Sequence, residues 1–126
     1  MIANITLVIP DYDEAIAYFT GMLGFDVVED TQMSETKRFV RVRPRGGDTC
    51  LLLAQPKNDT ERAAIGNAAG GRVAFFLHTD DFQREYSALE TSGAEFTGAI
   101  RHEAYGTVVV FKDPWGNLWD LVQPAE

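Results

Sequence analysis

The stretch that decides the fold is LVIPDYDEAIAYFTGMLGF, residues 7 to 25. Pro10 ends an apolar, β-branched run that begins at Ile2, which is typical of a strand. Asp11 and Glu14 follow with the spacing of a capping box, and Gly24 supplies a left-handed C-terminal residue. Between these signals, apolar side chains recur at helical spacing: Tyr12, Ile16, Phe19 and Leu23. The sequence predicts a strand, then a helix from Asp11 to about Leu23.

Short strands and a connector follow this helix. Three strands are expected over residues 25–30, 38–43 and 49–54, and a turn through residues 45–48 joins the last two. The next segment, residues 56–71, is polar, small and glycine-rich, with one helical turn around residues 61–65. The first module is therefore expected to span about residues 1–55, followed by a connector over about 56–71.

The pattern then starts again. Asp80 and Gln83 repeat the capping spacing, Gly93 repeats the helix stop, and the offsets 80 − 11 and 93 − 24 both equal 69. A constant offset indicates one module used twice. A strand over 72–78 precedes the second helix, and strands over 95–102, 106–112 and 118–123 follow it, with a turn at 113–117. We therefore predict an α+β domain over residues 1–126, with its second βαβββ module at about 72–126.

Alternation along the strands predicts which side chains share a face. Ile5, Leu7 and Ile9 should lie under the first helix, with Asn4 on the opposite face. In the second module, alternate apolar residues should pack on the helix: Val73, Phe75, Leu77, Trp119 and Leu121. Arg72, Phe76, His78 and Asp120 should then lie on the face without a helix. Two such faces turned toward each other would form a cup.

Composition excludes several functions. The 126 residues carry 11 Lys plus Arg and 19 Asp plus Glu, which gives a net charge of −8. Duplex binding needs clustered positive charge, so nucleic acid is not an expected partner. Cys50 is the single cysteine, and its expected role is that of a structural thiol, without a disulfide. No signal peptide or long apolar run indicates a membrane partner, and we expect a cytoplasmic protein.

The repeated pattern resembles the vicinal oxygen chelate superfamily, which includes glyoxalase I, extradiol dioxygenases and bleomycin resistance proteins. The resemblance depends on the paired βαβββ order, on residues 7–25 and on VVVFKDPWGNLWDLVQ, residues 108–123. It implies the cup-shaped mixed sheet of the glyoxalase/bleomycin resistance/dioxygenase fold, and it implies a homodimer. It does not identify the chemistry, since one fold hosts many functions.

The same resemblance implies where a metal would bind. Metal-using members hold a divalent ion on one residue from the first and one from the last strand of each module, and these positions correspond to Asn4, Leu52, Arg72 and Asp120. Leu52 cannot bind a metal, and the permanent charge of Arg72 repels one. We therefore expect no metal site at these degenerate positions and predict no cofactor, although a divalent metal stays open as the alternative.

An ion pair is one replacement for the metal. We expect Arg72 and Asp120 to lie on neighbouring strands and to pair across the cup. The competing interpretation is that Arg72, at a strand start, points to solvent. A separate metal site formed by His102, Glu103 and Asp120 is a weaker alternative, because no short-range spacing supports it.

A basic cluster stands out in this acidic chain. Five of its eleven basic residues lie within nine positions: Lys37, Arg38, Arg41, Arg43 and Arg45. The cluster could receive an anionic small molecule through Arg41, or it could be the charged, exposed face of a strand. The two histidines, His78 and His102, are candidate bases or ordinary surface residues.

The expected function is binding of a small, anionic organic molecule in the cup, without the metal of the family. The alternative is a metal-dependent lyase or dioxygenase of the glyoxalase I type. Whether the chain is an enzyme and which residue is catalytic are left open, as is a cup formed between swapped halves. A more distant alternative is a ferredoxin-like sensing module. The expected ligand-binding residues are Asn4, Arg41, Leu52, Arg72, Phe76, His78, His102, Tyr105 and Asp120.

Overall fold

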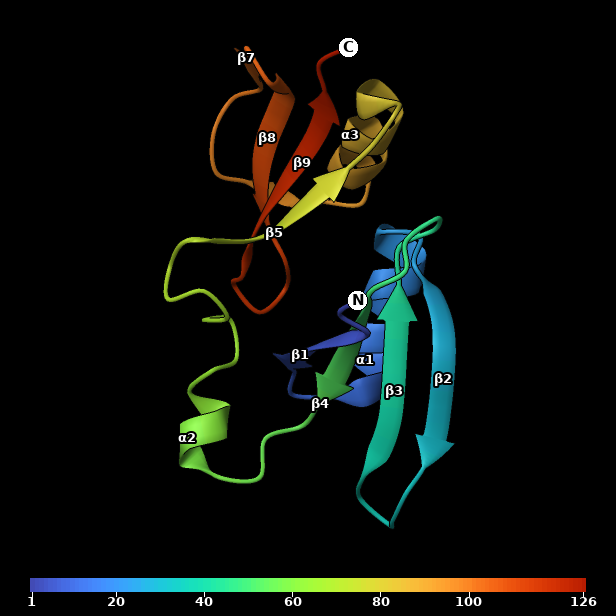
Figure 1. The fold of residues 1–126 in the computed structure, drawn as a ribbon. Helices are drawn as coiled ribbons and strands as arrows, with labels where there is room; N and C mark the ends of the chain where they lie inside the picture. Colours follow the sequence, from blue (N-terminus) through green and yellow to red (C-terminus); the bar gives the residue numbers. More distant parts are fainter. The chain divides into compact units, whose positions relative to one another are not determined.

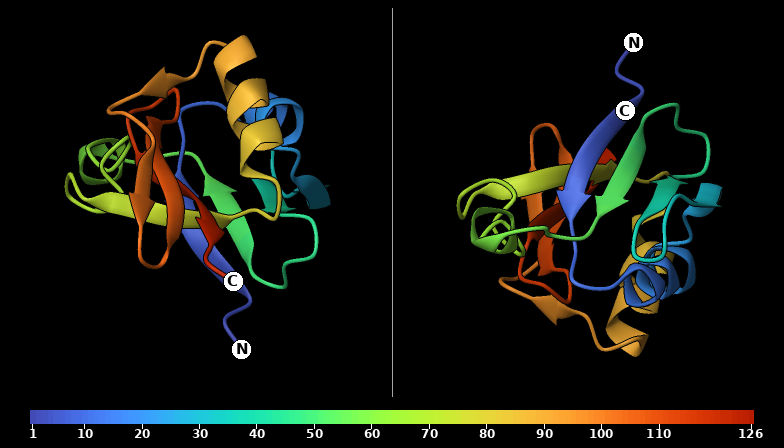
Figure 2. Two further views of the ribbon diagram at one scale, coloured as in Figure 1. Left: turned by 90° about the horizontal axis from the view of Figure 1, so that it is seen from above. Right: turned by 90° about the horizontal axis from the view of Figure 1, so that it is seen from below.

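A computed structural model describes all 126 residues and shows two compact units, Met1–Ile65 and Gly66–Glu126. Each unit contains a mixed sheet with helices on one face (Figure 1, Figure 2). The α+β fold with two mixed sheets is thus confirmed. None of the helices has the length and hydrophobicity needed to cross a bilayer.

The first unit builds its sheet in the order β1-β4-β3-β2. Strand β1 runs parallel to β4, and the other pairs are antiparallel. Since a parallel pair needs a crossover, the helical segment between β1 and β2 passes over one face of the sheet. The elements are β1 (Asn4–Val8), α1 (Tyr12–Ala17), the π-helical segment η1 (Tyr18–Met22), β2 (Asp26–Gln32), β3 (Arg38–Arg43), β4 (Cys50–Ala54) and α2 (Asp59–Arg62).

The second unit repeats this topology with the order β5-β9-β8-β6, and β7 also pairs with β8. Strands β5 and β9 are parallel, and the remaining pairs are antiparallel. Helix α3 lies along one face of the sheet (Figure 1). The elements are β5 (Val73–His78), α3 (Phe82–Thr91), β6 (Glu95–Phe96), β7 (Arg101–Glu103), β8 (Gly106–Lys112) and β9 (Leu118–Pro124).

Much of each core lies between the sheet and its helix, as alternation predicts, although Val108 and Val122 are also buried on the opposite face of the second sheet. In the first unit, Leu7, Ile9 and Leu53 are at most 1% exposed. In the second, Trp119 and Leu121 are at most 2% exposed, and the Trp119 ring packs 4.4 Å from the Phe75 ring. Each fully buried side chain of this kind stabilises the fold by about 1.5–3 kcal/mol. The prediction for Ile5 is wrong, because at the sheet edge 45% of it is exposed.

The predicted N-terminal helix cap is correct in the first unit, whereas in the second unit the cap lies one residue later than predicted. Glu14 N donates to Asp11 Oδ2 at 2.8 Å, so the predicted cap is confirmed, and the helical segment ends at Met22, with a π-helical last turn. The second cap is Asp81, which accepts from Arg84 N at 3.2 Å, and not Asp80. Thr79 accepts a hydrogen bond from Asp81 N, and this turn delays the helix by one residue.

Two other boundaries differ from prediction. The strand expected over residues 95–102 is two strands, β6 and β7, because the chain bends through Thr97 and Gly98 and pairs with β8 on both sides of the bend. The helical turn of the connector is Asp59–Arg62, earlier than expected, because Asn58 caps it by accepting from Glu61 N at 2.8 Å.

The turn at 113–117 is confirmed, and a buried carboxylate organises it. Asp113 is 4% exposed and accepts five hydrogen bonds, from the backbone N–H groups of residues 115, 116 and 117 and from the side chains of Asn117 and Trp119. Asn117 in turn accepts from Ala68 N at 3.0 Å. The glycine-rich loop that opens the second unit is thereby fastened to the turn.

Candidate functional site

The strand register of the second unit brings several predicted residues to the sheet face opposite α3. Phe76 pairs with Asp120, which pairs with Val110. In the next row, His78 pairs with Val122, and this row continues through Val108 to Arg101 on β7. Cross-strand partners point to the same side of a sheet. We call the group formed by Phe76, His78, Arg101, Val110 and Asp120 the Asp120 face.

Asp120 is the unusual member of this face. It is 6% exposed, its Oδ1 atom is buried, and it accepts no hydrogen bond. A buried polar group without a partner costs about 1–3 kcal/mol. Burial raises the pKa of the Asp120 carboxyl above its ordinary value, and the positive charge of Arg101 partly offsets this effect. Asp120 is therefore a buried carboxyl whose Oδ1 has no hydrogen-bond partner in the chain.

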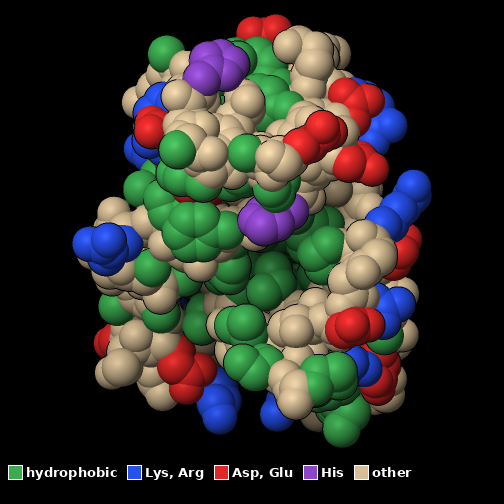
Figure 3. All heavy atoms as spheres, turned by 45° about the horizontal axis from the view of Figure 1, so that its top comes forward, with side chains coloured by type: hydrophobic (Ala, Val, Ile, Leu, Met, Phe, Trp, Pro, Cys, Tyr) green, Lys and Arg blue, Asp and Glu red, His purple; other side chains and the backbone are tan.

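The neighbours of Asp120 on this face are mostly apolar or exposed. Phe76 is 65% exposed, which is unusual for a phenylalanine in the middle of a strand. His78 is exposed as well, and both histidines of the chain are visible at the surface in Figure 3. Arg101 is not a free cation, because its Nη1 lies 3.1 Å from Glu103 Oε1. An aromatic surface thus lies beside an unpartnered carboxyl.

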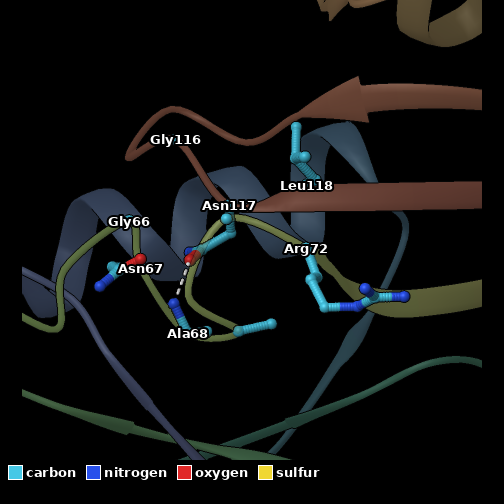
Figure 4. Close-up of a pocket in the computed structure, with 9 residues that line it drawn as sticks. Gly66, Asn67, Ala68, Arg72, Gly116, Asn117 and Leu118 are labelled. Carbon is cyan, nitrogen blue, oxygen red and sulfur yellow. Dashed lines mark hydrogen bonds between the residues drawn. The ribbon is translucent and has the colours of Figure 1, made fainter.

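The predicted ion pair between Arg72 and Asp120 is not formed. The register shifts between Val73 and Phe75, so the alternation that holds from Phe75 onward does not extend back to Arg72. Arg72 precedes β5, is exposed, and points away from the hydrogen bond between Asn117 and Ala68 (Figure 4). The irregularity also places Val73 in register with Leu118, on the Asp120 side and not under the helix.

His102 and Tyr105 do not join Asp120. His102 pairs with Thr107, which in turn pairs with Gln123, so His102 lies on the helix side of the sheet, and its Nδ1 is 3.5 Å from Thr107 Oγ1. Tyr105 is in the turn between β7 and β8 and is 55% exposed. The alternative metal site of His102, Glu103 and Asp120 is therefore not assembled, and no group of three acidic, His or Cys side chains is.

The register of the first unit brings Asn4, Arg41 and Leu52 to the sheet face opposite α1. Arg41 pairs with Leu52, and its Nε donates to Asn4 Oδ1 at 2.9 Å. Its two other nitrogens contact Cys50 Sγ at 3.4 Å and Glu29 Oε1 at 3.6 Å. Arg41 is therefore a well-connected side chain whose charge is balanced within its own sheet.

Acidic partners also balance much of the surrounding basic cluster. Arg38 contacts Asp13 at 2.8 Å and Asp30 at 2.7 Å, and Arg45 lies 3.8 Å from Asp26. The hydrogen bond from Arg38 lowers the pKa of Asp30. These contacts match the charged, exposed face of a strand more closely than an open anion site.

The residues at the family's metal-ligand positions do not fit a metal ion. The Asn4 oxygen already accepts from the Arg41 guanidinium, a cation that repels a dication. Leu52 offers no donor atom, and Arg72 lies outside the strand and is positively charged. Asp120 is the single suitable ligand, whereas structural and catalytic zinc sites take at least three ligands from the protein.

A small pocket lies elsewhere in the second unit, between the loop at Gly66–Arg72 and the turn at Gly116–Leu118 (Figure 4). Its volume is about 10 Å³, the size of one water molecule. Such a pocket is too small for an organic ligand, and its geometry serves to join the loop to the turn.

The sequence interpretation missed Arg101 and Val110. The sequence did not identify Arg101 as a residue of this face, because one unbroken strand was expected over 95–102. In the structure Arg101 lies on a separate strand, β7, where it pairs with Val108. Alternation along β8 could have identified Val110, since Val108, Val110 and Lys112 share one side. The pairing of β8 with Asp120 was the missing information.

A comparison with family models matches residues 1–121 to the Glyoxalase/Bleomycin resistance protein/Dioxygenase superfamily. The chain belongs to this superfamily. An uncharacterized protein of Shewanella frigidimarina (strain NCIMB 400) is 48% identical over 124 residues, which cover 97% of this chain and 92% of that protein.

Two solved structures place the chain within the superfamily by shape as well. UcmS2 matches with a TM-score of 0.82 and 27% identity, covering 97% of this chain and 96% of its own. TnmS3, an antibiotic binding protein from Streptomyces sp. CB03234, matches with a TM-score of 0.78 and 26% identity, covering 99% and 96%. The resemblance that the sequence indicated is thus confirmed for the family and the fold.

Proposed function

We propose that this superfamily member binds a small organic molecule and does so without a metal ion. The observation that carries the proposal is the Asp120 face, where a buried carboxyl without a hydrogen-bond partner lies beside an exposed phenylalanine. Ligand sites typically combine apolar area with a few polar groups that fix the orientation of the ligand.

The donor set supports the metal-free part of the proposal. A metal at the family's positions would need ligands from Asn4, Leu52 and Arg72 in addition to Asp120, and these offer one engaged amide oxygen, a hydrocarbon and a cation. The similarity to TnmS3, an antibiotic binding protein, is consistent with binding rather than catalysis. The proposal does not include an anionic ligand, because the positive charge of Arg41 is already balanced by Glu29.

The test is a titration of the full chain with neutral aromatic fragments, followed by amide NMR shifts in the presence of EDTA. We expect shifts at Phe76, His78 and Val110, and the same affinity in a second series without EDTA to which Zn²⁺, Ni²⁺, Mn²⁺ or Fe²⁺ is added. Elemental analysis of the purified protein should find less than one metal per chain. Stoichiometric metal that is lost in Asp120→Ala, or binding that requires metal, would instead support the glyoxalase-type lyase or dioxygenase.

A further inference from the structure

We infer that the ligand of the Asp120 face carries a protonated amine close to a flat aromatic ring. This inference rests on the proposed function and adds the chemical class of the molecule. The geometry behind it is the direct cross-strand pairing of Phe76 with Asp120, which puts an aromatic ring and a carboxyl in adjacent positions on one face.

The carboxyl is the group that selects the amine. Both oxygens of Asp120 can only accept hydrogen bonds when the group is ionised, and the buried Oδ1 has no donor in the chain. An ammonium supplies charge-assisted donors, which are the strongest partners for a carboxylate. A ligand carboxylate or sulfonate at the same place would add a second negative charge next to an already costly one.

The charged side chains near Asp120 do not supply the missing hydrogen-bond donor. On the same side of the sheet, Arg101 pairs with Glu103, and Lys112 lies 3.2 Å from Glu95. His78 is exposed and two residues along β5 from Phe76. The net charge of −8 favours the approach of a cation over that of an anion.

The ring of Phe76 selects the aromatic part. At 65% exposure, most of its surface is free to be covered by a ligand. Val110, in register on the other side of Asp120, extends the apolar area. Stacking on an aromatic side chain favours flat ligands, and a cation beside the ring gains a further attraction.

Three probes share one aromatic ring and differ in the charge of their substituent, so they distinguish the effect of ligand charge from that of ligand shape. They are 1-naphthylmethylamine, 1-naphthalenemethanol and 1-naphthoate. We would titrate each into the full chain at pH 7.5 with EDTA, using calorimetry and amide NMR. We expect the amine to bind at least about tenfold more tightly than the naphthoate, with shifts at Phe76 and Asp120. Phe76→Leu should weaken all three probes by a similar factor.

The matched variants are Asp120→Asn and Asp80→Asn, which remove the same charge from the same unit. Asp80 is exposed, so its variant should keep the preference for the amine, whereas Asp120→Asn should lose it. Asp120→Ser serves the same purpose if the asparagine variant misfolds. Equal affinity for amine and naphthoate, or a preference that survives in both Asp120 variants, overturns this inference and leaves the proposed function standing. No binding of any probe at millimolar concentration contradicts both.

Discussion

Replacing Asp120 with asparagine should stabilise the protein at neutral pH. Asp120 is 6% exposed and its buried oxygen has no hydrogen-bond partner, so the ionised carboxyl costs the folded state about 1–3 kcal/mol. Asparagine has nearly the same shape and no charge, but its amide also stays partly unsatisfied. We therefore expect a net gain of about 1 kcal/mol in the free energy of unfolding at pH 7, or about 4 °C in Tm.

The gain should depend on pH with a defined sign. Burial raises the pKa of Asp120 in the folded state above the ordinary value of 3.8. Below the ordinary value the carboxyl is protonated in both states, and it carries no ionisation penalty. As the pH rises through the raised pKa, the folded protein loses stability relative to the variant. The difference between variant and wild type should thus be smallest at pH 3.5 and should grow as the pH rises from the ordinary value of 3.8 to the raised pKa.

Urea unfolding of both proteins at several pH values between 3.5 and 7 measures this difference. Asp113→Asn is the matched control, because Asp113 is equally buried but accepts five hydrogen bonds. It should lose about 3 kcal/mol, since hydrogen bonds to a charged group contribute about 1.5–3 kcal/mol each. If the Asp120→Asn protein is less stable than wild type at pH 7, or if the difference in stability does not change with pH, the ionised carboxyl does not destabilise the folded state.

Three other predictions concern the loop, the basic cluster and the oligomeric state. Gly66→Ala should cost at least about 2 kcal/mol, because a Cβ there would lie 1.8 Å from the Trp115 carbonyl oxygen at φ +71°. Gly70→Ala, at φ +63° with no atom within 4 Å, should lose only about 1 kcal/mol in the same thermal unfolding assay. Arg38→Met should lose about 1 kcal/mol or less at low salt, and less again in 1 M NaCl. Its effect should also disappear as the pH falls through the lowered pKa of Asp30, and an effect unchanged by salt and acid would contradict the ion pairs. Since the family resemblance implies a homodimer, light scattering should give twice the chain mass of 14.0 kDa, and a mass of 14.0 kDa would contradict that expectation.

Local signals predicted much of each unit. Asp11 caps its helix because its carboxylate, three residues before Glu14, accepts from a backbone N–H of the first helical turn, which needs no information from the rest of the chain. The turn at 113–117 was readable for the same reason, since aspartate, proline, glycine and asparagine each favour tight backbone conformations. The alternation of apolar residues also identified four buried core residues, Leu7, Ile9, Trp119 and Leu121.

Signals that depend on pairing between distant strands were less reliable. Arg72 was assigned to the face of Asp120 by counting from one end of β5, and a single register shift after Val73 made that count wrong. His102 was grouped with Asp120, although pairing with Thr107 puts it on the other side of the sheet. One irregular residue reverses every side chain beyond it, because the strand period is two.

Residue types and their spacing along the chain were enough to predict the α+β fold, the first helix cap, the final turn and membership of the superfamily. All of these depend on residue types and spacings within a few positions of one another, or on a pattern repeated along the chain. The tertiary structure decided that Asp120 is buried without a partner, that Phe76 lies beside it, and that the guanidinium of Arg41 is used by Asn4 and Glu29. The burial and the hydrogen-bond partners of a side chain depend on strands that are far apart in the sequence and pair only in the folded chain. The free energy of a charged side chain depends on the neighbours that these strands bring to it.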